Sequence, residues 1–69
     1  MNNITLKAEY IKLGQALKAA NLVSSGAESK IHIINGLVKV NNETETRRGR
    51  KLYDGDVISY DGNEIRIEK

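Results

Sequence analysis

Residues 24–40 read Ser24-Ser25-Gly26-Ala27-Glu28-Ser29-Lys30-Ile31-His32-Ile33-Ile34-Asn35-Gly36-Leu37-Val38-Lys39-Val40 and contain a helix followed by the start of a strand. Ser25 stands three residues before Glu28, the spacing at which a hydroxyl caps the first helical turn and the carboxylate reaches back. Asn35-Gly36 ends the helix, because glycine readily adopts the left-handed conformation of a helix terminus. These signals predict a helix over residues 26–35. Its apolar stripe is expected to contain Ala27, Ile31 and Ile34, with Ile33 beside it.

Downstream of this helix the apolar period changes from a helical one to two, which is typical of strands. The first strand runs from Leu37 to the turn at Asn41-Asn42. Residues 57–60 and 64–68 alternate in the same way, and Asp61-Gly62 joins them as a hairpin. No regular element is expected in the polar stretch 43–51.

Upstream, apolar residues recur at the positions i, i+3, i+4 and i+7 of one helix face, namely Leu13, Ala16, Leu17 and Ala20. This pattern predicts a helix over residues 11–20 that ends near Asn21, with Lys12, Gln15 and Lys18 on its polar face. A short strand is also expected at residues 4–6. Two short helices and a small, mostly antiparallel sheet of three to five strands indicate an α+β class in which the helices cover one sheet face.

Length and composition limit the possible architectures. Sixty-nine residues suit a single domain, residues 1–69, and the 39% hydrophobic and 29% charged composition is that of a globular chain rather than a disordered one. The chain has no cysteine, so stability must come from packing without disulfides. The sequence contains neither a targeting segment nor an apolar run long enough to span a membrane, and we expect a cytoplasmic monomer.

Charge is distributed unevenly along the chain. Residues 1–52 carry nine Lys or Arg and four Asp or Glu, whereas residues 53–69 carry two and five, respectively. Such polarity favours a polyanionic partner, although a solvated basic face would have the same composition.

The residue types needed for catalysis are scarce. His32 is the only histidine and there is no cysteine, so a Cys–His pair or a metal site of these ligands cannot form within one chain. Asp54 and Asp56 flank a glycine between apolar runs, which is first of all a turn. The glycines have no nucleotide-binding spacing. We therefore expect no enzyme activity, no catalytic residue, no metal and no cofactor.

Cations cluster between two predicted strands, at Arg47, Arg48, Arg50 and Lys51. The planar fork of arginine binds phosphate bidentately or stacks on a base, so the cluster suits RNA, while the alternative is a solvated loop. Lys12 and Lys30 stand near the two helix starts, where unpaired N–H groups and the helix dipole also favour phosphate. These six residues are the predicted RNA contacts.

The combined motifs resemble the S-four RNA-binding domain, named for ribosomal small-subunit protein four. The resemblance is based on the run from Ser24 to Lys30, the run from Gly36 to Asn41, and Lys51 with Gly55-Asp56-Val57-Ile58. The additional runs Glu9-Tyr10-Ile11, Leu13-Gly14-Gln15, Leu17-Lys18 and Glu45 to Leu52 are similar to the stand-alone bacterial YaaA / YbcJ-like subfamily. The resemblance implies an alpha-L fold, binding of structured RNA and ribosomes, and a role in ribosome maturation.

The chain departs from the pattern of the wider family at five positions. Lys12-Leu13-Gly14 stands where Arg-Leu-Asp is common, and Gly26 where an arginine usually follows the serine. We hypothesise that the cluster from Arg47 to Lys51 replaces these contacts. Ser29 replaces a small alanine, which suggests close packing between the helices, and Asn42 replaces a turn glycine.

The predicted function is therefore non-catalytic binding of structured RNA, ribosomal in the first instance, through phosphate contacts and shape. A protein-interaction adaptor in ribosome assembly or DNA replication is the alternative. An enzyme is the third and weakest hypothesis, because RNA-modifying members of the wider family carry a separate catalytic domain.

Overall fold

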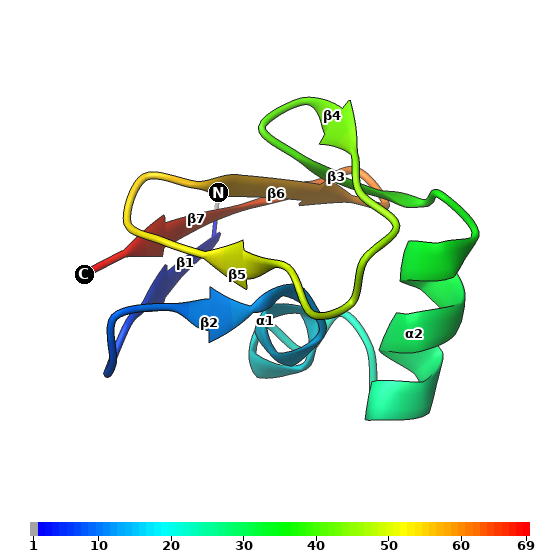
Figure 1. Cartoon of the computed structure of the whole chain (residues 1–69), viewed down its shortest axis with the longest axis horizontal. Helices are drawn as coiled ribbons and strands as arrows, with labels where there is room; N and C mark the ends of the chain where they lie inside the picture. The colour runs from blue at the N-terminus through cyan, green and yellow to red at the C-terminus, as the bar shows by residue number, and fades with distance from the viewer. Residues whose placement is uncertain (1) are drawn as a thin grey trace.

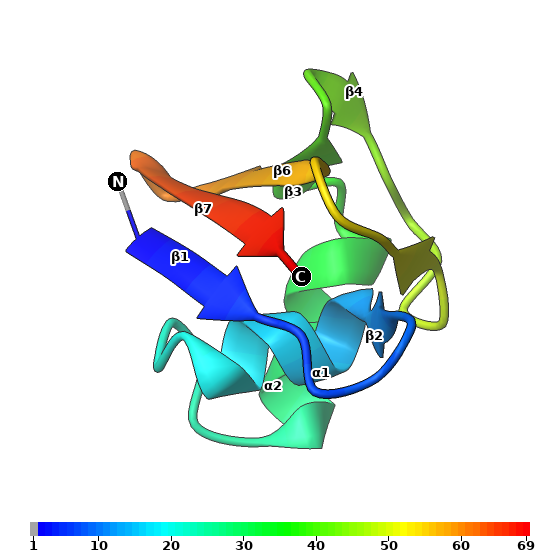
Figure 2. The same cartoon turned by 90° about the vertical axis from the view of Figure 1, so that its left-hand side faces the viewer.

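The computed structural model describes residues 2–69, which fold into two helices packed beneath one face of a sheet (Figures 1 and 2). The elements are, in chain order, β1 (Asn2–Thr5), β2 (Ile11–Lys12), α1 (Leu13–Ala19), α2 (Gly26–Ile34), β3 (Val38–Val40), β4 (Glu43–Thr44), β5 (Lys51–Leu52), β6 (Val57–Tyr60) and β7 (Asn63–Glu68). Five strands form one sheet in the order β1-β7-β6-β3-β4, and β2 pairs with β5 in a separate two-stranded ribbon. All pairs are antiparallel except β1 with β7. The predicted α+β class is confirmed.

The turns follow from residues that tolerate a positive φ. Asn41 and Asn42 have φ values of 52° and 68°, and Asp61 and Gly62 have values of 50° and 77°. Positive φ at both central residues is the conformation of a tight hairpin turn, in which asparagine, aspartate and glycine are favoured. The predicted turn at Asn41-Asn42 and the predicted hairpin at Asp61-Gly62 are therefore confirmed, and the first of these turns also proves to join a hairpin, β3–β4.

Several element boundaries differ from the prediction. The first strand is found at Asn2–Thr5 rather than residues 4–6. The polar stretch 43–51 is not wholly irregular, because β4 and the first residue of β5 lie at its two ends. Helix α1 begins at Leu13 rather than at residue 11, because Ile11 and Lys12 pair with β5 instead of joining the helix.

The predicted rotation of α2 is wrong. Its buried residues are Ser29 and Ile33, whereas Ile31 and Ile34 are 57% and 55% exposed and Ala27 is also exposed. Ser29 lies against α1 at Gly14, so the small residue faces the neighbouring helix and the larger ones face outward. The close packing of helices expected at Ser29 is confirmed, and it determines which face is buried.

The hydrophobic core lies between the helices and the five-stranded sheet. It draws on both helices, the ribbon and the central strands, and its fully buried aliphatic residues include Leu13, Leu17, Ile33, Val38, Leu52, Ile58, Ile65 and Ile67. No helix within residues 2–69 has the length and the apolar run needed to cross a bilayer.

The start of α2 tests the role of local capping in this small fold. The Ser25 hydroxyl accepts a hydrogen bond from the Glu28 N–H at 3.1 Å, while the Glu28 carboxylate accepts one from the Ser24 N–H at 2.9 Å. We expect Ser25→Ala to lower the free energy of unfolding by about 0.5–2 kcal/mol. Urea denaturation measures this loss, and Ser24→Ala is the matched control because the structure uses only the backbone N–H of Ser24. Equal stability of the two variants would contradict the capping role.

Candidate nucleic-acid interface

The loop between β4 and β5 is organised around the buried carboxylate of Glu45, which is 6% exposed. Glu45 accepts hydrogen bonds from the Arg47 backbone N–H at 3.0 Å, from Arg47 Nε at 2.9 Å and from Arg47 Nη2 at 3.0 Å. Arg50 Nη1 donates a fourth, at 3.0 Å. Two of the cations predicted to contact RNA are thus ion-paired within the protein.

These bonds stabilise the charged form of the carboxyl group. The hydrogen bond from the Arg47 side chain is the main reason that the pKa of Glu45 falls from 4.5 to about 2, and the Arg47 N–H and Arg50 lower it further against the opposing effect of burial. The same contact raises the pKa of Arg47. Glu45 was not among the predicted site residues. The only sequence signal for this role is the position of Glu45, two residues before Arg47 and five residues before Arg50.

Arg48 is placed differently from its neighbours. Its carbonyl accepts a hydrogen bond from the Gly14 N–H at 3.1 Å, and its side chain passes directly over Gly14. A Cβ atom on Gly14 would lie 2.7 Å from Arg48 Cγ, so only glycine leaves room for this arrangement. Within residues 2–69 no hydrogen bond or ion pair engages the Arg48 guanidinium.

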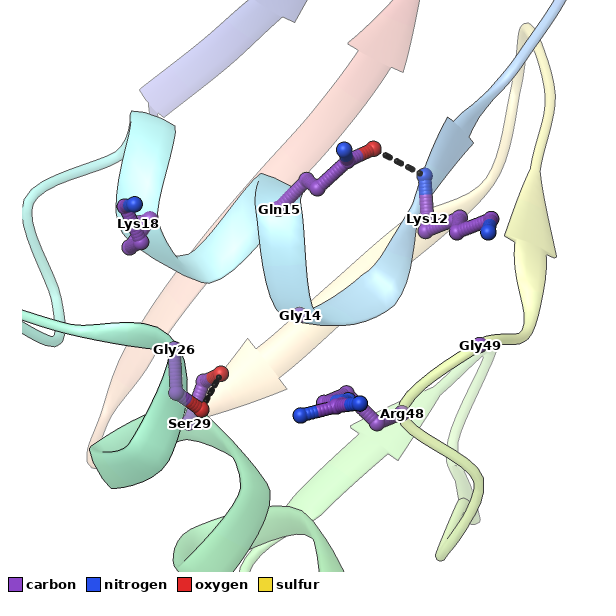
Figure 3. A pocket seen from close by; sticks show the side chains of 8 residues that line it. All are labelled: Lys12, Gly14, Gln15, Lys18, Gly26, Ser29, Arg48 and Gly49. Atoms are coloured by element: carbon purple, nitrogen blue, oxygen red, sulfur yellow. Dashed lines mark hydrogen bonds between the residues drawn. The ribbon is translucent and has the colours of Figure 1, made fainter.

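Arg48 extends into a hollow of about 340 Å³ between the loop and the starts of α1 and α2 (Figure 3). Three cations, three glycines and two neutral polar residues line it, namely Lys12, Lys18, Arg48, Gly14, Gly26, Gly49, Gln15 and Ser29. Both neutral residues are already engaged, since Gln15 Oε1 accepts from the Lys12 N–H at 3.4 Å and the Ser29 hydroxyl donates to the Gly26 carbonyl at 2.9 Å. No carboxylate lines the hollow, which is therefore suited to an anion.

The structure brings only part of the predicted set to this hollow. Lys12 and Arg48 line it, whereas Lys30 lies on the exposed surface of α2 outside it. Lys51 lies on the ribbon with its Nζ 4.8 Å from the centre of the Tyr10 ring. Lys18 was missed, although its position on the polar face of the predicted helix was evident.

One expected source of phosphate affinity is absent at the start of α1. The N–H groups of Leu13 and Gly14 donate to the carbonyls of Arg50 and Arg48, at 2.9 and 3.1 Å. The expectation of unpaired N–H groups there is wrong for these two residues, because the loop carbonyls occupy them. The positive charge of this helix start comes instead from the surrounding side chains.

The remaining titratable residues of interest have structural partners. His32 is half-buried, and its Nδ1 hydrogen-bonds the hydroxyl of Tyr60, whose pKa is raised by burial and by the nearby charges of Asp61 and Glu28. Asp56 accepts from the Tyr53 N–H at 2.8 Å, in keeping with a turn. Within residues 2–69, no group of three or more His, Asp or Glu side chains is arranged to hold a metal ion.

Residues 4–68 match the sequence model of the S4 domain. The chain belongs to the S4 domain family. It is 46% identical over 61 residues to RlbA of Bacillus subtilis (strain 168), named as a probable ribosome maturation protein, with 88% of this chain and 86% of RlbA aligned. It is 34% identical over 61 residues to YbcJ of Escherichia coli (strain K12), whose name assigns it RNA binding by inference, with 88% and 87% aligned.

The fold agrees with a solved S4 structure. The solution structure of E. coli YbcJ, described as having an alpha-L motif involved in RNA binding, superposes with a TM-score of 0.76 at 33% identity and covers all of this chain and 89% of YbcJ. The alpha-L fold implied by the sequence resemblance is confirmed. Two of the departures from the wider S4 pattern, Gly14 and Gly26, line the hollow that Arg48 enters.

Glu45 provides a test of how the S4 loop is held. We expect Glu45→Gln to lower the free energy of unfolding at pH 7 by about 1–3 kcal/mol, because it weakens a charge-assisted network and leaves buried groups poorly paired. Glu43→Gln is the control, since Glu43 is an exposed carboxylate on β4.

The same variant should change the acid dependence of stability. A carboxyl group whose pKa is lowered on folding stabilises the native state above its unfolded pKa, and this contribution is lost as the pH falls. The stability difference between wild type and Glu45→Gln should therefore shrink as the pH falls from about 5 toward 2 in urea denaturation. A difference that is independent of pH would contradict the ionised, buried state of Glu45.

Proposed function

We propose that this S4 chain is a non-catalytic RNA-binding protein that holds structured RNA, ribosomal RNA or its precursor, through the hollow lined by Lys12, Lys18 and Arg48. The observation that carries the proposal is the composition of this hollow, which combines three cations and three glycines with no carboxylate. Exposed cations that share one hollow without a carboxylate give it a positive potential, which favours the binding of an anion.

The geometry fits a phosphate of the nucleic-acid backbone. Arginine presents a planar fork that matches phosphate oxygens, and the lysines add point charges at the rim. Gly26 and Gly49 have open space where a Cβ atom would lie, so that a phosphate can approach the main chain at the start of α2 closely. Contacts of this kind position a protein on structured RNA by shape rather than by base sequence.

The relatives support the same function. The names and title of RlbA and YbcJ refer to ribosome maturation and RNA binding, and both align with most of this chain. The absence of a catalytic role is proposed from the residue types, since His32 and the turn aspartates serve the fold.

A protein-interaction adaptor remains the second candidate, because α2 and the residues after it expose large apolar side chains. Ile31, Ile34 and Leu37 are 57%, 55% and 56% exposed. Nuclease treatment of the material that co-purifies with the protein separates the two functions, since RNA-mediated association is lost and direct protein contact is kept.

The salt dependence of RNA binding tests the hollow. Each phosphate contact releases condensed counterions, so Arg48→Gln should weaken binding of an RNA hairpin and reduce the slope of log K against log salt by about 0.7–0.9. Lys18→Gln should act in the same direction. Thermal stability should change little, because both side chains are exposed.

Lys39→Gln is the matched control for charge. Lys39 lies on β3 between the buried Val38 and Val40, so it faces the side of the sheet away from the helices. It should leave the salt slope unchanged. Equal effects of the Lys39 and Arg48 variants, or tighter binding of a DNA hairpin than of the RNA hairpin, would contradict the proposed function.

A second prediction uses the contact between Gly14 and Arg48. Gly14→Ala should displace Arg48 and weaken RNA binding, because its Cβ atom would lie 2.7 Å from Arg48 Cγ. In an Arg48→Ala background the same change should leave binding unaltered, and the gain in helix propensity of up to about 1 kcal/mol should be partly offset by Ser29 Oγ, which lies 3.3 Å from the added Cβ atom. Binding titrations and melting curves of the four proteins measure both effects. Additive losses would show that Gly14 acts independently of Arg48.

A further inference from the structure

The outward face of the β2–β5 ribbon carries four side chains, three of which lie outside the hollow. Ile11 pairs with Leu52 in the ribbon, and Leu52 is fully buried in the core. Successive residues of a strand point to opposite faces, so the flanking positions on both strands point outward. These outward residues are Tyr10, Lys12, Lys51 and Tyr53.

The two tyrosines form an exposed aromatic pair. Their ring centroids are 6.0 Å apart at an interplanar angle of 50°, and the residues are 38% and 46% exposed. Lys51 Nζ lies 4.8 Å from the centre of the Tyr10 ring, within the range of a cation–π contact. The third tyrosine of the chain, Tyr60, is buried. Two of the three tyrosine rings therefore lie on the surface.

The two lysines of this face repel each other in the free protein. Lys12 and Lys51 are directly opposite each other in the antiparallel register, and like charges in that position destabilise a ribbon. No ion pair within residues 2–69 engages either lysine. An anionic partner would remove this repulsion.

We propose that the outward face of the β2–β5 ribbon binds an unpaired nucleotide of the RNA, with its base stacked on Tyr10 and Tyr53 and its flanking phosphates on Lys12 and Lys51. The inference rests on the proposed function, since it adds a second contact to the same ligand. Aromatic side chains stack on unpaired bases of any sequence, and neighbouring cations follow the backbone.

The ribbon and the hollow form a continuous surface. Lys12 belongs to both, because it lines the hollow and also faces Lys51 across the ribbon. The ribbon leads directly into the start of α1 (Figure 1). One RNA strand can thus place a phosphate in the hollow and an adjacent unpaired base on the ribbon.

The test compares two RNA hairpins that differ only by one unpaired adenosine in the stem. Tyr10→Leu/Tyr53→Leu should weaken binding of the hairpin with the unpaired base by about 5- to 150-fold, the range for loss of stacking on one base. It should leave the affinity for the fully paired hairpin within about twofold of wild type. Tyr10→Phe/Tyr53→Phe, which keeps both rings, should retain wild-type affinity for both hairpins.

Intrinsic fluorescence gives an independent readout, because the chain has no tryptophan and its emission comes from tyrosine. The hairpin with the unpaired base should quench the emission of wild type more strongly than the paired hairpin does. Leucine variants that bind both hairpins like wild type, or lose both equally, would overturn the inference and leave the proposed function standing. A wild-type protein that binds neither hairpin would overturn the proposed function itself.

Discussion

Glu45 links three parts of the molecule, namely β3, the loop between β4 and β5, and the start of α1. Its backbone N–H donates to the Val38 carbonyl at 3.0 Å, which ties it to β3, and its side chain gathers the guanidinium groups of Arg47 and Arg50. The loop so formed presents the carbonyls that accept hydrogen bonds from Leu13 and Gly14 at the start of α1. The position of Arg48 over α1, and with it the hollow, therefore depends on one ionised side chain.

The charged residues of this loop fall into two groups, those that are ion-paired within the protein and those that are not. Glu45 neutralises part of the positive charge of Arg47 and Arg50, whereas Arg48 and Lys51 have no carboxylate partner in the described residues. Arg48 reaches the hollow because Gly14 lacks a Cβ atom and Ser29 is small enough to lie beside it. In the wider S4 pattern an aspartate is common at position 14, and with Arg48 as placed here that side chain would have no room. Gly14 and the placement of Arg48 therefore depend on each other.

Features decided within a few residues were predicted correctly from the sequence. The cap at Ser25, the turn at Asn41-Asn42 and the hairpin at Asp61-Gly62 depend on local hydrogen bonds and on residues that tolerate positive φ. The rotation of α2 was not predicted correctly, because its buried face is selected by Gly14 in another helix. The number of cations in the sequence likewise overestimated how many cations of the loop are free to bind a ligand, because ion pairs form only in the folded chain. Only the folded loop shows that Glu45 holds Arg47 and Arg50.

The proposed binding face also carries a cost that the rest of this small domain must offset. Lys12 opposite Lys51 weakens the free protein, which has no disulfide to compensate. In the free protein Arg48 is already confined over Gly14 and Lys51 already contacts the Tyr10 ring. These side chains would therefore lose less entropy when a ligand binds. A polyanion would then both relieve the repulsion and meet side chains that need little further ordering, so a bound ligand would stabilise the fold through linkage.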